Sequence, residues 1–168
     1  MGPARDRTTT PLYTSAQRAR RDASRWTLVQ GVLAPLQFLV FLVSLAMVLR
    51  TLATGEGLSA ANGSVVVKTL VLYTIMVTGS IWEKEVFGRY LFAPAFFWED
   101  VFSMAVLALH TAYLGALATG WLSGNDLLLL ALAAYAAYLV NAAQFLLKLR
   151  AARLQGVGAL PLMAEGAR

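Results

Sequence analysis

Four long runs of uncharged residues constrain this chain more than any other feature of its sequence. With Lys68 accepted near the beginning of the second run, they cover 27–49, 65–82, 101–121 and 127–147. A helix crosses the hydrocarbon core of a bilayer with about 20 apolar residues, so each run is long enough for one crossing. Only 14% of the residues are charged, whereas soluble domains carry about a quarter. We therefore expect an all-α integral membrane protein, a single domain with four transmembrane helices.

The basic residues predict how these helices are oriented. Every Lys and Arg except Arg50 and Lys68 lies before the first run, between the second and third runs, or after the fourth. Because cytoplasmic segments are enriched in Lys and Arg, we expect both termini and the middle connector on the cytoplasmic side. The same distribution explains the net charge of +5 without nucleic acid as a partner. Residues 1–26 are then a basic cytoplasmic arm containing a surface helix, and 155–168 a disordered tail.

The composition removes several classes of site. The chain has no Cys, so it forms no disulfide and offers no thiolate to a metal or a substrate. A single His excludes a zinc site built from several His ligands and a haem held by two of them. The sequence therefore predicts no metal ion of the protein's own.

The connector between the second and third runs is both aromatic and acidic. Residues 82–100 contain seven aromatic residues and four acids. Tryptophans at its two ends suit the aromatic belt of a membrane interface. The other rings, Phe97 among them, predict a segment 87–98 that lies in the interface and forms one wall of a pocket.

The four acids of this connector, Glu83, Glu85, Glu99 and Asp100, have two interpretations. Acids favour helix N-termini, which accounts for Glu99 and Asp100 at the start of the third run. Ion pairs with Lys84 or the basic arm account for Glu83 and Glu85. Four carboxyl groups at one interface are nevertheless also typical of a general acid–base cluster, so both interpretations stay open.

Polar side chains are also expected near the middle of the membrane. Eleven helical residues rise about 16 Å, half the hydrocarbon thickness, and this distance from the cytoplasmic ends leads to Tyr73, His110 and Tyr138, with Asn141 one turn away. Hydrogen bonds between helices explain such residues, and contact with a ligand is the alternative. For His110 the two interpretations are balanced, because a neutral imidazole is also a natural axial ligand for a metal in a flat macrocycle.

Three stretches of the sequence are long and distinctive: "YTSAQRARRDASRWTLVQGVLAPLQFLVFLVSL", "VVVKTLVLYTIMVTGSIWEKEVFGRYLFAPAFFWEDVFSM" and "NAAQFLLKLRAARL". They resemble the 2-vinyl bacteriochlorophyllide hydratase family, over residues 13–154. Members of this family add water across the 3-vinyl group of chlorophyllide a and form a 1-hydroxyethyl group in bacteriochlorophyll biosynthesis. The resemblance implies a multi-pass protein of the bacterial inner membrane, cytoplasmic or intracytoplasmic and photosynthetic. It implies no cofactor, because the magnesium belongs to the substrate.

The resemblance also suggests roles for the acidic connector. Hydration of a vinyl group needs an acid and a base, and we assign these roles to Glu83 and Glu99. Asp100 and Glu85 are their substitutes. Lys84 or Arg89 would hold the carboxyl groups of the chlorin.

A second arrangement competes with this one. If His110 binds the substrate magnesium, the vinyl group lies far from the interfacial acids, and Tyr73, Tyr138 or water would have to act instead.

A different class of function also remains open. A four-helix bundle with one His and many aromatic residues suits a non-enzymatic chlorin-binding or assembly subunit of a photosynthetic membrane. A small transporter or a subunit of a lipid enzyme has weaker support. Membrane lipid is an expected partner in each case, and the sequence is compatible with a homo-oligomer or with contacts to other enzymes of the pigment pathway.

Overall fold

The structure, a computed structural model, describes residues 12–158, and residues 1–11 and 159–168 lie outside the described part. The described residues form five helices: α1 (Ser15–Ala23), α2 (Arg25–Thr54), α3 (Leu58–Phe87), α4 (Phe97–Thr119) and α5 (Gly124–Gly158). Helices α2 to α5 are each long and apolar enough to cross a membrane. The prediction of an all-helical chain with four helices of membrane-spanning length is therefore confirmed.

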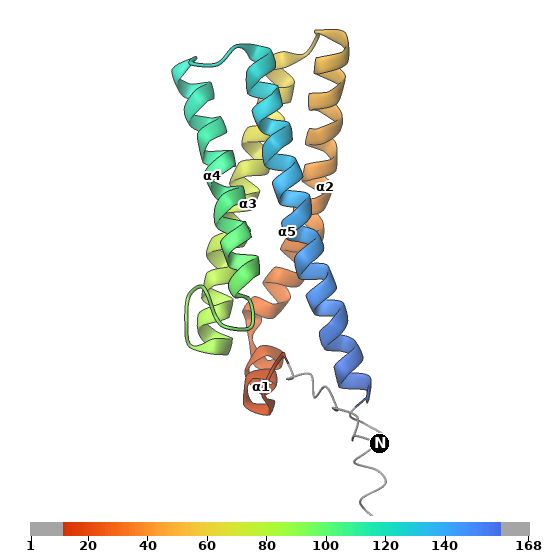
Figure 1. Cartoon of the computed structure of the whole chain (residues 1–168), viewed down its shortest axis with the longest axis vertical. Coiled ribbons are helices and arrows are strands. Elements are labelled where there is room, and N and C mark those ends of the chain that lie inside the picture. The colour runs from red at the N-terminus through yellow and green to blue at the C-terminus, as the bar shows by residue number, and fades with distance from the viewer. Residues whose placement is uncertain (1–11, 159–168) are drawn as a thin grey trace, which may run out of the picture.

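The four long helices stand side by side, and α1 lies beneath one end of the bundle (Figure 1). Helix α2 packs mainly against α3, and α4 mainly against α5. Their outer surfaces carry exposed large apolar side chains, among them Leu28 (73% exposed), Val77 (60%) and Leu146 (68%). So much exposed apolar surface is unfavourable in contact with water and favourable in contact with lipid. The exterior therefore suits a bilayer as the solvent of a multi-pass protein.

Helix α3 begins well before the uncharged run at 65, because its first turns pack inside the bundle. Ala61 is fully buried, and the side chain of Asn62 accepts a hydrogen bond from the Tyr113 hydroxyl at 2.9 Å. The helix ends at Gly88, whose φ of 83° is the left-handed conformation that glycine adopts without steric cost. This early start places Lys68 three turns into the helix rather than at its beginning.

The main core is built from aromatic and small residues. The Phe41 ring packs edge-on against Tyr135, with ring centroids 5.4 Å apart, and tilted against Tyr138 at 5.0 Å. Ala61 and Ala131 are fully buried in the same core. Small residues allow membrane helices to approach one another closely, so the aromatic rings fill the space that remains between α2, α3 and α5.

A second, smaller core closes the end of the bundle where α1 lies. Phe96 from the α3–α4 connector contacts the rings of Tyr13, Trp82, Phe87 and Phe145 at centroid distances of 5.7 to 6.4 Å. Figure 1 shows the connector, α1 and the C-terminal part of α5 gathered at this end, whereas short turns join the helices at the other. The aromatic residues of the connector thus fasten it to the bundle.

The C-terminal end of α5 differs from one expectation. Residues 155–158 were predicted to begin a disordered tail, and they instead continue the helix. Residues 148–154 are Lys, Leu, Arg and Ala, all good helix formers, so the helix propagates past the apolar run. The remainder of that tail, 159–168, and the first part of the predicted arm lie outside the described residues.

Candidate active site

The four acids of the connector fall into three different environments at the α1 end of the bundle. Glu83 and Asp100 meet under the connector, Glu99 faces α5, and Glu85 faces the basic arm. Glu83 and Glu99, which the sequence analysis paired as acid and base, therefore lie at the same end but have different immediate partners.

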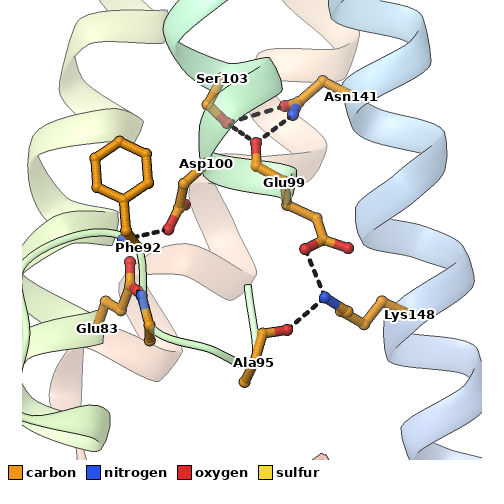
Figure 2. A network of polar contacts seen from close by, with 9 residues as sticks. Glu83, Phe92, Ala95, Glu99, Asp100, Ser103, Asn141 and Lys148 are labelled. Carbon is orange, nitrogen blue, oxygen red and sulfur yellow. Dashed lines mark hydrogen bonds and ion pairs between the residues drawn. The ribbon is translucent and has the colours of Figure 1, made fainter. Parts of the chain in front are cut away.

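Glu83 and Asp100 hold the connector through its backbone. The Ala93 N–H donates to Glu83 Oε1 at 2.5 Å, and the Phe92 N–H donates to Asp100 Oδ2 at 2.7 Å (Figure 2). Both acids are buried, at 4% and 5% exposure. Because these two N–H groups belong to consecutive residues, the two buried carboxyl groups lie close together. Two buried carboxyl groups at close range favour a proton on one of them, so this pair is suited to store a proton.

The connector adopts an unusual conformation at the same place. Phe92 has a φ of 59°, and it is the one described residue other than glycine in the left-handed region. That conformation costs about 1–3 kcal/mol for a bulky residue. The carboxylates that accept from the N–H groups of Phe92 and Ala93 offset this cost.

Glu99 points in the other direction, toward α5. Its Oε2 pairs with Lys148 Nζ at 2.5 Å, and the same Nζ donates to the Ala95 carbonyl of the connector (Figure 2). The Glu99 backbone carbonyl accepts from the Ser103 hydroxyl and the Asn141 amide, each at 2.8 Å. Asn141 and Lys148 of α5 thus fix the first turn of α4 and its carboxylate.

A pocket of about 450 Å³ opens beside this ion pair. Glu99 and Lys148 line it, together with Gln144, three apolar residues of α5, and Leu12 from the arm. The other carboxylate oxygen of Glu99, Oε1, accepts no hydrogen bond from the described residues. The pocket therefore presents a carboxylate acceptor and an ammonium donor to whatever enters it.

The remaining charged candidates lie on the outside of this end. Glu85 is exposed and accepts from the Ser24 hydroxyl at 2.7 Å, which ties α3 to the arm. Lys84 is exposed and donates to the Gly88 carbonyl at 3.0 Å. Arg89 and the Phe97 ring (43% exposed) also face outward. None of these four lines the pocket beside Glu99.

The arm packs against this end through Tyr13, which is 5% exposed. Burial raises the pKa of the Tyr13 phenol, and the nearby Arg21 guanidinium opposes that effect. Arg20 Nε donates to the Val86 carbonyl at 3.0 Å and joins α1 to the end of α3. These contacts bring Leu12 to the wall of the pocket.

His110 lies deeper in the bundle and is fully buried. Its Nδ1 is 2.8 Å from the Val106 carbonyl, which only accepts, so Nδ1 carries the proton. Its Nε2 then accepts from Lys68 Nζ at 2.9 Å. Both ring nitrogens have protein partners, so axial ligation of a metal would require this contact with Lys68 to break.

Lys68 is a residue whose environment the sequence analysis missed. It is fully buried, and its Nζ lies 4.1 Å from the centroid of the Tyr138 ring, beside His110. Its position near the beginning of the second uncharged run indicates a residue at the membrane border. The polar residues before Lys68 belong to the first turns of α3. They are the sequence signal that could have placed Lys68 deeper in the bundle.

The other predicted polar residues have partners of their own. The Tyr73 hydroxyl is 2.7 Å from that of Thr111, on the outer side of α3 and α4. Tyr138 belongs to the main core. Among the described residues, no group of three or more His, Asp and Glu side chains is arranged to hold a metal ion.

Together the fold and the site define a polytopic membrane protein with buried carboxyl groups and a pocket at one end of its bundle. Residues 13–151 match the family model described as 2-vinyl bacteriochlorophyllide hydratase. The chain belongs to this family, as the sequence analysis expected.

Two curated relatives carry the family name. The 2-vinyl bacteriochlorophyllide hydratase of Cereibacter sphaeroides is 71% identical over 143 residues, which cover 85% of this chain and 89% of that protein. Its counterpart in Rhodobacter capsulatus is 69% identical over 144 residues, which cover 86% and 84% respectively. No solved structure matches the chain.

Proposed function

We propose that this protein adds water to the vinyl group of a bacteriochlorophyllide precursor and forms a 1-hydroxyethyl group. The observation that carries the proposal is 71% identity, across most of both chains, to a protein named 2-vinyl bacteriochlorophyllide hydratase. The substrate proposed in particular is chlorophyllide a, hydrated at its 3-vinyl group. The carboxyl cluster and the pocket supply groups that this reaction needs.

Hydration of a vinyl group joins one water molecule to a carbon–carbon double bond without oxidation or reduction. An acid adds a proton to the terminal CH2, which becomes CH3, and the inner carbon becomes a cation that the macrocycle stabilises. The oxygen of water bonds to that carbon and loses one proton to a base. The protein therefore needs a proton donor, a proton acceptor and a bound water, and no cofactor of its own.

We assign the base to Glu99 and the acid to the Glu83–Asp100 pair. Glu99 lines the pocket with one carboxylate oxygen free to accept a proton from water, and Lys148 pairs with the other oxygen. Glu83 and Asp100 are buried and accept from the N–H groups of consecutive residues, an arrangement that favours a proton shared between them. Asp100 directly follows Glu99, so acid and base share the first turn of α4.

The pocket of about 450 Å³ would take the vinyl-bearing edge of the chlorin, with the rest of the flat ring against lipid and the exposed rings of Phe92, Phe97 and Trp98. Lys84 and Arg89, which are exposed at the end of α3 and in the connector, would bind the carboxyl groups of the substrate. His110 would stay with Lys68 rather than bind magnesium.

We also propose that the site lies at the cytoplasmic face of a bacterial inner membrane. The basic residues Arg18, Arg20, Lys84 and Arg89 gather at the same end as the carboxyl groups. The positive-inside rule places such an end in the cytoplasm.

The test is conversion of the vinyl chlorin by membranes that contain the protein. Wild-type membranes should form the hydroxyethyl product, and Glu99→Gln should lower the rate about a hundredfold or more, because an amide does not accept the proton. The matched control is Glu56→Gln, an exposed acid in the turn between α2 and α3, which should keep the wild-type rate. Chlorin that co-purifies unchanged, with no product from the wild type, would instead favour a pigment-binding subunit.

A further inference from the structure

Two side chains of α5 hold Glu99 from the same face of that helix. Asn141 and Lys148 are seven residues apart, which is about two helical turns. The Asn141 amide donates to the Glu99 backbone carbonyl at 2.8 Å, and Lys148 Nζ pairs with Glu99 Oε2 at 2.5 Å (Figure 2). The first turn of α4 and the carboxylate that it carries are therefore each fixed by a separate contact with α5.

Lys148 also binds the connector. The same Nζ donates to the Ala95 carbonyl and lies 5.1 Å from the centroid of the Phe96 ring. The side chain of Lys148 is 27% exposed, and that of Glu99 is 8% exposed. An ion pair so shielded from water is costly to break, because either charge alone would be poorly solvated. The ammonium thus has fixed partners on both α4 and the connector.

The two carboxylate oxygens of Glu99 have different surroundings. Oε2 accepts from Lys148, whereas Oε1 accepts no hydrogen bond from the described residues. Among those residues, the fully buried side-chain oxygens without a partner belong to Gln37 and Gln144, so Glu99 Oε1 keeps some exposed surface. Glu99 and Lys148 both line the pocket. The contact with Lys148 therefore occupies one oxygen of the carboxylate and leaves the other available.

We infer that Lys148 is the positioning residue of the base: it binds Oε2 and thereby fixes the orientation in which Oε1 of Glu99 accepts the proton of water. This inference rests on the proposed hydration. The water oxygen bonds to the inner vinyl carbon, its proton passes to Oε1, and Lys148 neither gains nor loses a proton. A carboxylate that rotates freely spends less time in the productive orientation. Lys148 thus acts on the rate through Glu99 and not through contact with the substrate.

Two replacements of Lys148 test this role. Lys148→Met keeps the length and the helix propensity of the side chain but removes both donated hydrogen bonds. We expect kcat to fall about a hundredfold, the cost of a misplaced catalytic group, with little change in the KM for the vinyl chlorin. Lys148→Arg, whose guanidinium also pairs with carboxylates, should stay within about tenfold of the wild-type kcat.

An added amine tests the ammonium group itself. Lys148→Ala removes the side chain from the wall of the pocket and opens space beside Glu99 for a small cation. Ethylammonium should raise the hydration rate of this variant by about tenfold or more, because it supplies the missing charged N–H donor. Tetramethylammonium has the same charge but no N–H donor, so it should not restore the rate. Only folded protein can respond, so a loss of folded protein does not imitate this rescue.

Arg153 provides the matched control. It is an exposed basic residue of α5 and does not line the pocket. Arg153→Ala should keep the wild-type rate and should not respond to ethylammonium.

A double variant identifies the group through which Lys148 acts. In the Glu99→Gln background, Lys148→Met should slow hydration little further, because the base that Lys148 positions is already absent. An equal loss in both backgrounds would overturn the inference, since Lys148 would then act through the connector or the fold.

Two other results would also overturn it: a wild-type kcat in Lys148→Met, and equal rates of Lys148→Ala with the two cations. If Lys148→Ala does not fold, the Met, Arg and double variants decide, and equal losses in Met and Arg would count against the inference. Failure of the wild type to form hydroxyethyl product would instead overturn the proposed hydration itself.

Discussion

At the scale of single residues, Glu83 both holds the connector in place and is assigned to proton transfer. Two substitutions separate these two roles. Gln at this position would still accept from the Ala93 N–H and would donate to Asp100, so the connector should stay in place. It would carry no transferable proton, and we expect hydration to slow by about a hundredfold or more.

Glu83→Ala should instead leave the buried Ala93 N–H without its acceptor, whereas Asp100 keeps the Phe92 N–H. We expect it to lower the free energy of unfolding by about 1–3 kcal/mol, because Glu83 is buried at 4% exposure. Product formation and thermal unfolding in detergent measure the two effects. A wild-type rate in Glu83→Gln would remove Glu83 from the role of acid.

The contact between Lys68 and His110 leads to a second prediction, which concerns the stability of the bundle. Lys68→Met leaves His110 Nε2 without a donor, and His110→Leu leaves the buried Lys68 amine without an acceptor. Replacing both by apolar residues removes both penalties, and such replacements are often tolerated in cores. The double variant should therefore be more stable than the sum of the two single effects by about 1–3 kcal/mol.

Unfolding in detergent of the wild type, both single variants and the double variant gives this coupling energy. His110→Leu combined with Arg50→Met, at an exposed arginine, is the additive control. Strict additivity for Lys68 and His110 would mean that the two side chains do not depend on each other.

The sequence identified some of these residues and not others, for physical reasons. Asn141, Glu99 and Asp100 stood out because polar groups at helix ends and mid-membrane positions are few in so apolar a chain. Lys68 was assigned to the membrane border because it stands near the edge of an uncharged run. Its full burial and its contacts with His110 and Tyr138 show instead that it lies inside the bundle.

At the scale of elements, α1 and the residues before it close one side of the pocket. Leu12 lines the pocket, and Tyr13 packs on Phe87 with ring centroids 5.7 Å apart. The acids assigned to catalysis lie on α3 and α4 instead. A chain that begins at Ser24 should therefore keep its catalytic groups but lose part of the wall that contacts the substrate.

We expect this truncation to raise the KM for the vinyl chlorin about tenfold, the effect of losing one buried leucine contact, with a smaller change in kcat. Steady-state rates in detergent or nanodiscs measure both. Thr14→Ala, which removes only the hydrogen bond that caps α1, should have a much weaker effect. A fall in kcat at constant KM would show that the arm positions the acids rather than the substrate.

For the connector between α3 and α4, the sequence predicted a candidate site but not the backbone conformation. Its aromatic and acidic composition identified it as the part of the chain most suited to a site. How it folds could not be predicted, because the donors that hold it are the backbone N–H groups of Phe92 and Ala93. A left-handed φ usually falls on a glycine. Because position 92 is a phenylalanine, the sequence contains no signal for the left-handed conformation there.

At the scale of the whole molecule, the groups assigned to chemistry all lie at one end. That end carries the carboxyl groups, the pocket and most of the described basic residues. Short turns join the helices at the other end (Figure 1). The lengths of the uncharged runs were sufficient to predict four membrane-spanning helices. They could not predict which helices pack together, because lipid-facing and helix-facing residues in a membrane are similarly apolar.

The orientation of the bundle is the last prediction, and the absence of Cys makes it simple to test. Single cysteines at Glu56, between α2 and α3, and at Asn125, in the first turn of α5, should react with a membrane-impermeant maleimide in intact spheroplasts, because both positions are exposed at the end far from the carboxyl groups. Cysteines at Arg18 and Arg150 should react only in inverted vesicles, because basic segments are retained in the cytoplasm.

The reverse labelling pattern would place the Glu99 pocket on the periplasmic side. A chlorin with ionised carboxyl groups crosses a bilayer poorly, since burying a charge in hydrocarbon is costly. The substrate must therefore reach the pocket from the side on which it is made. The labelling pattern thus decides on which side of the membrane the enzyme that supplies the vinyl chlorin has to work.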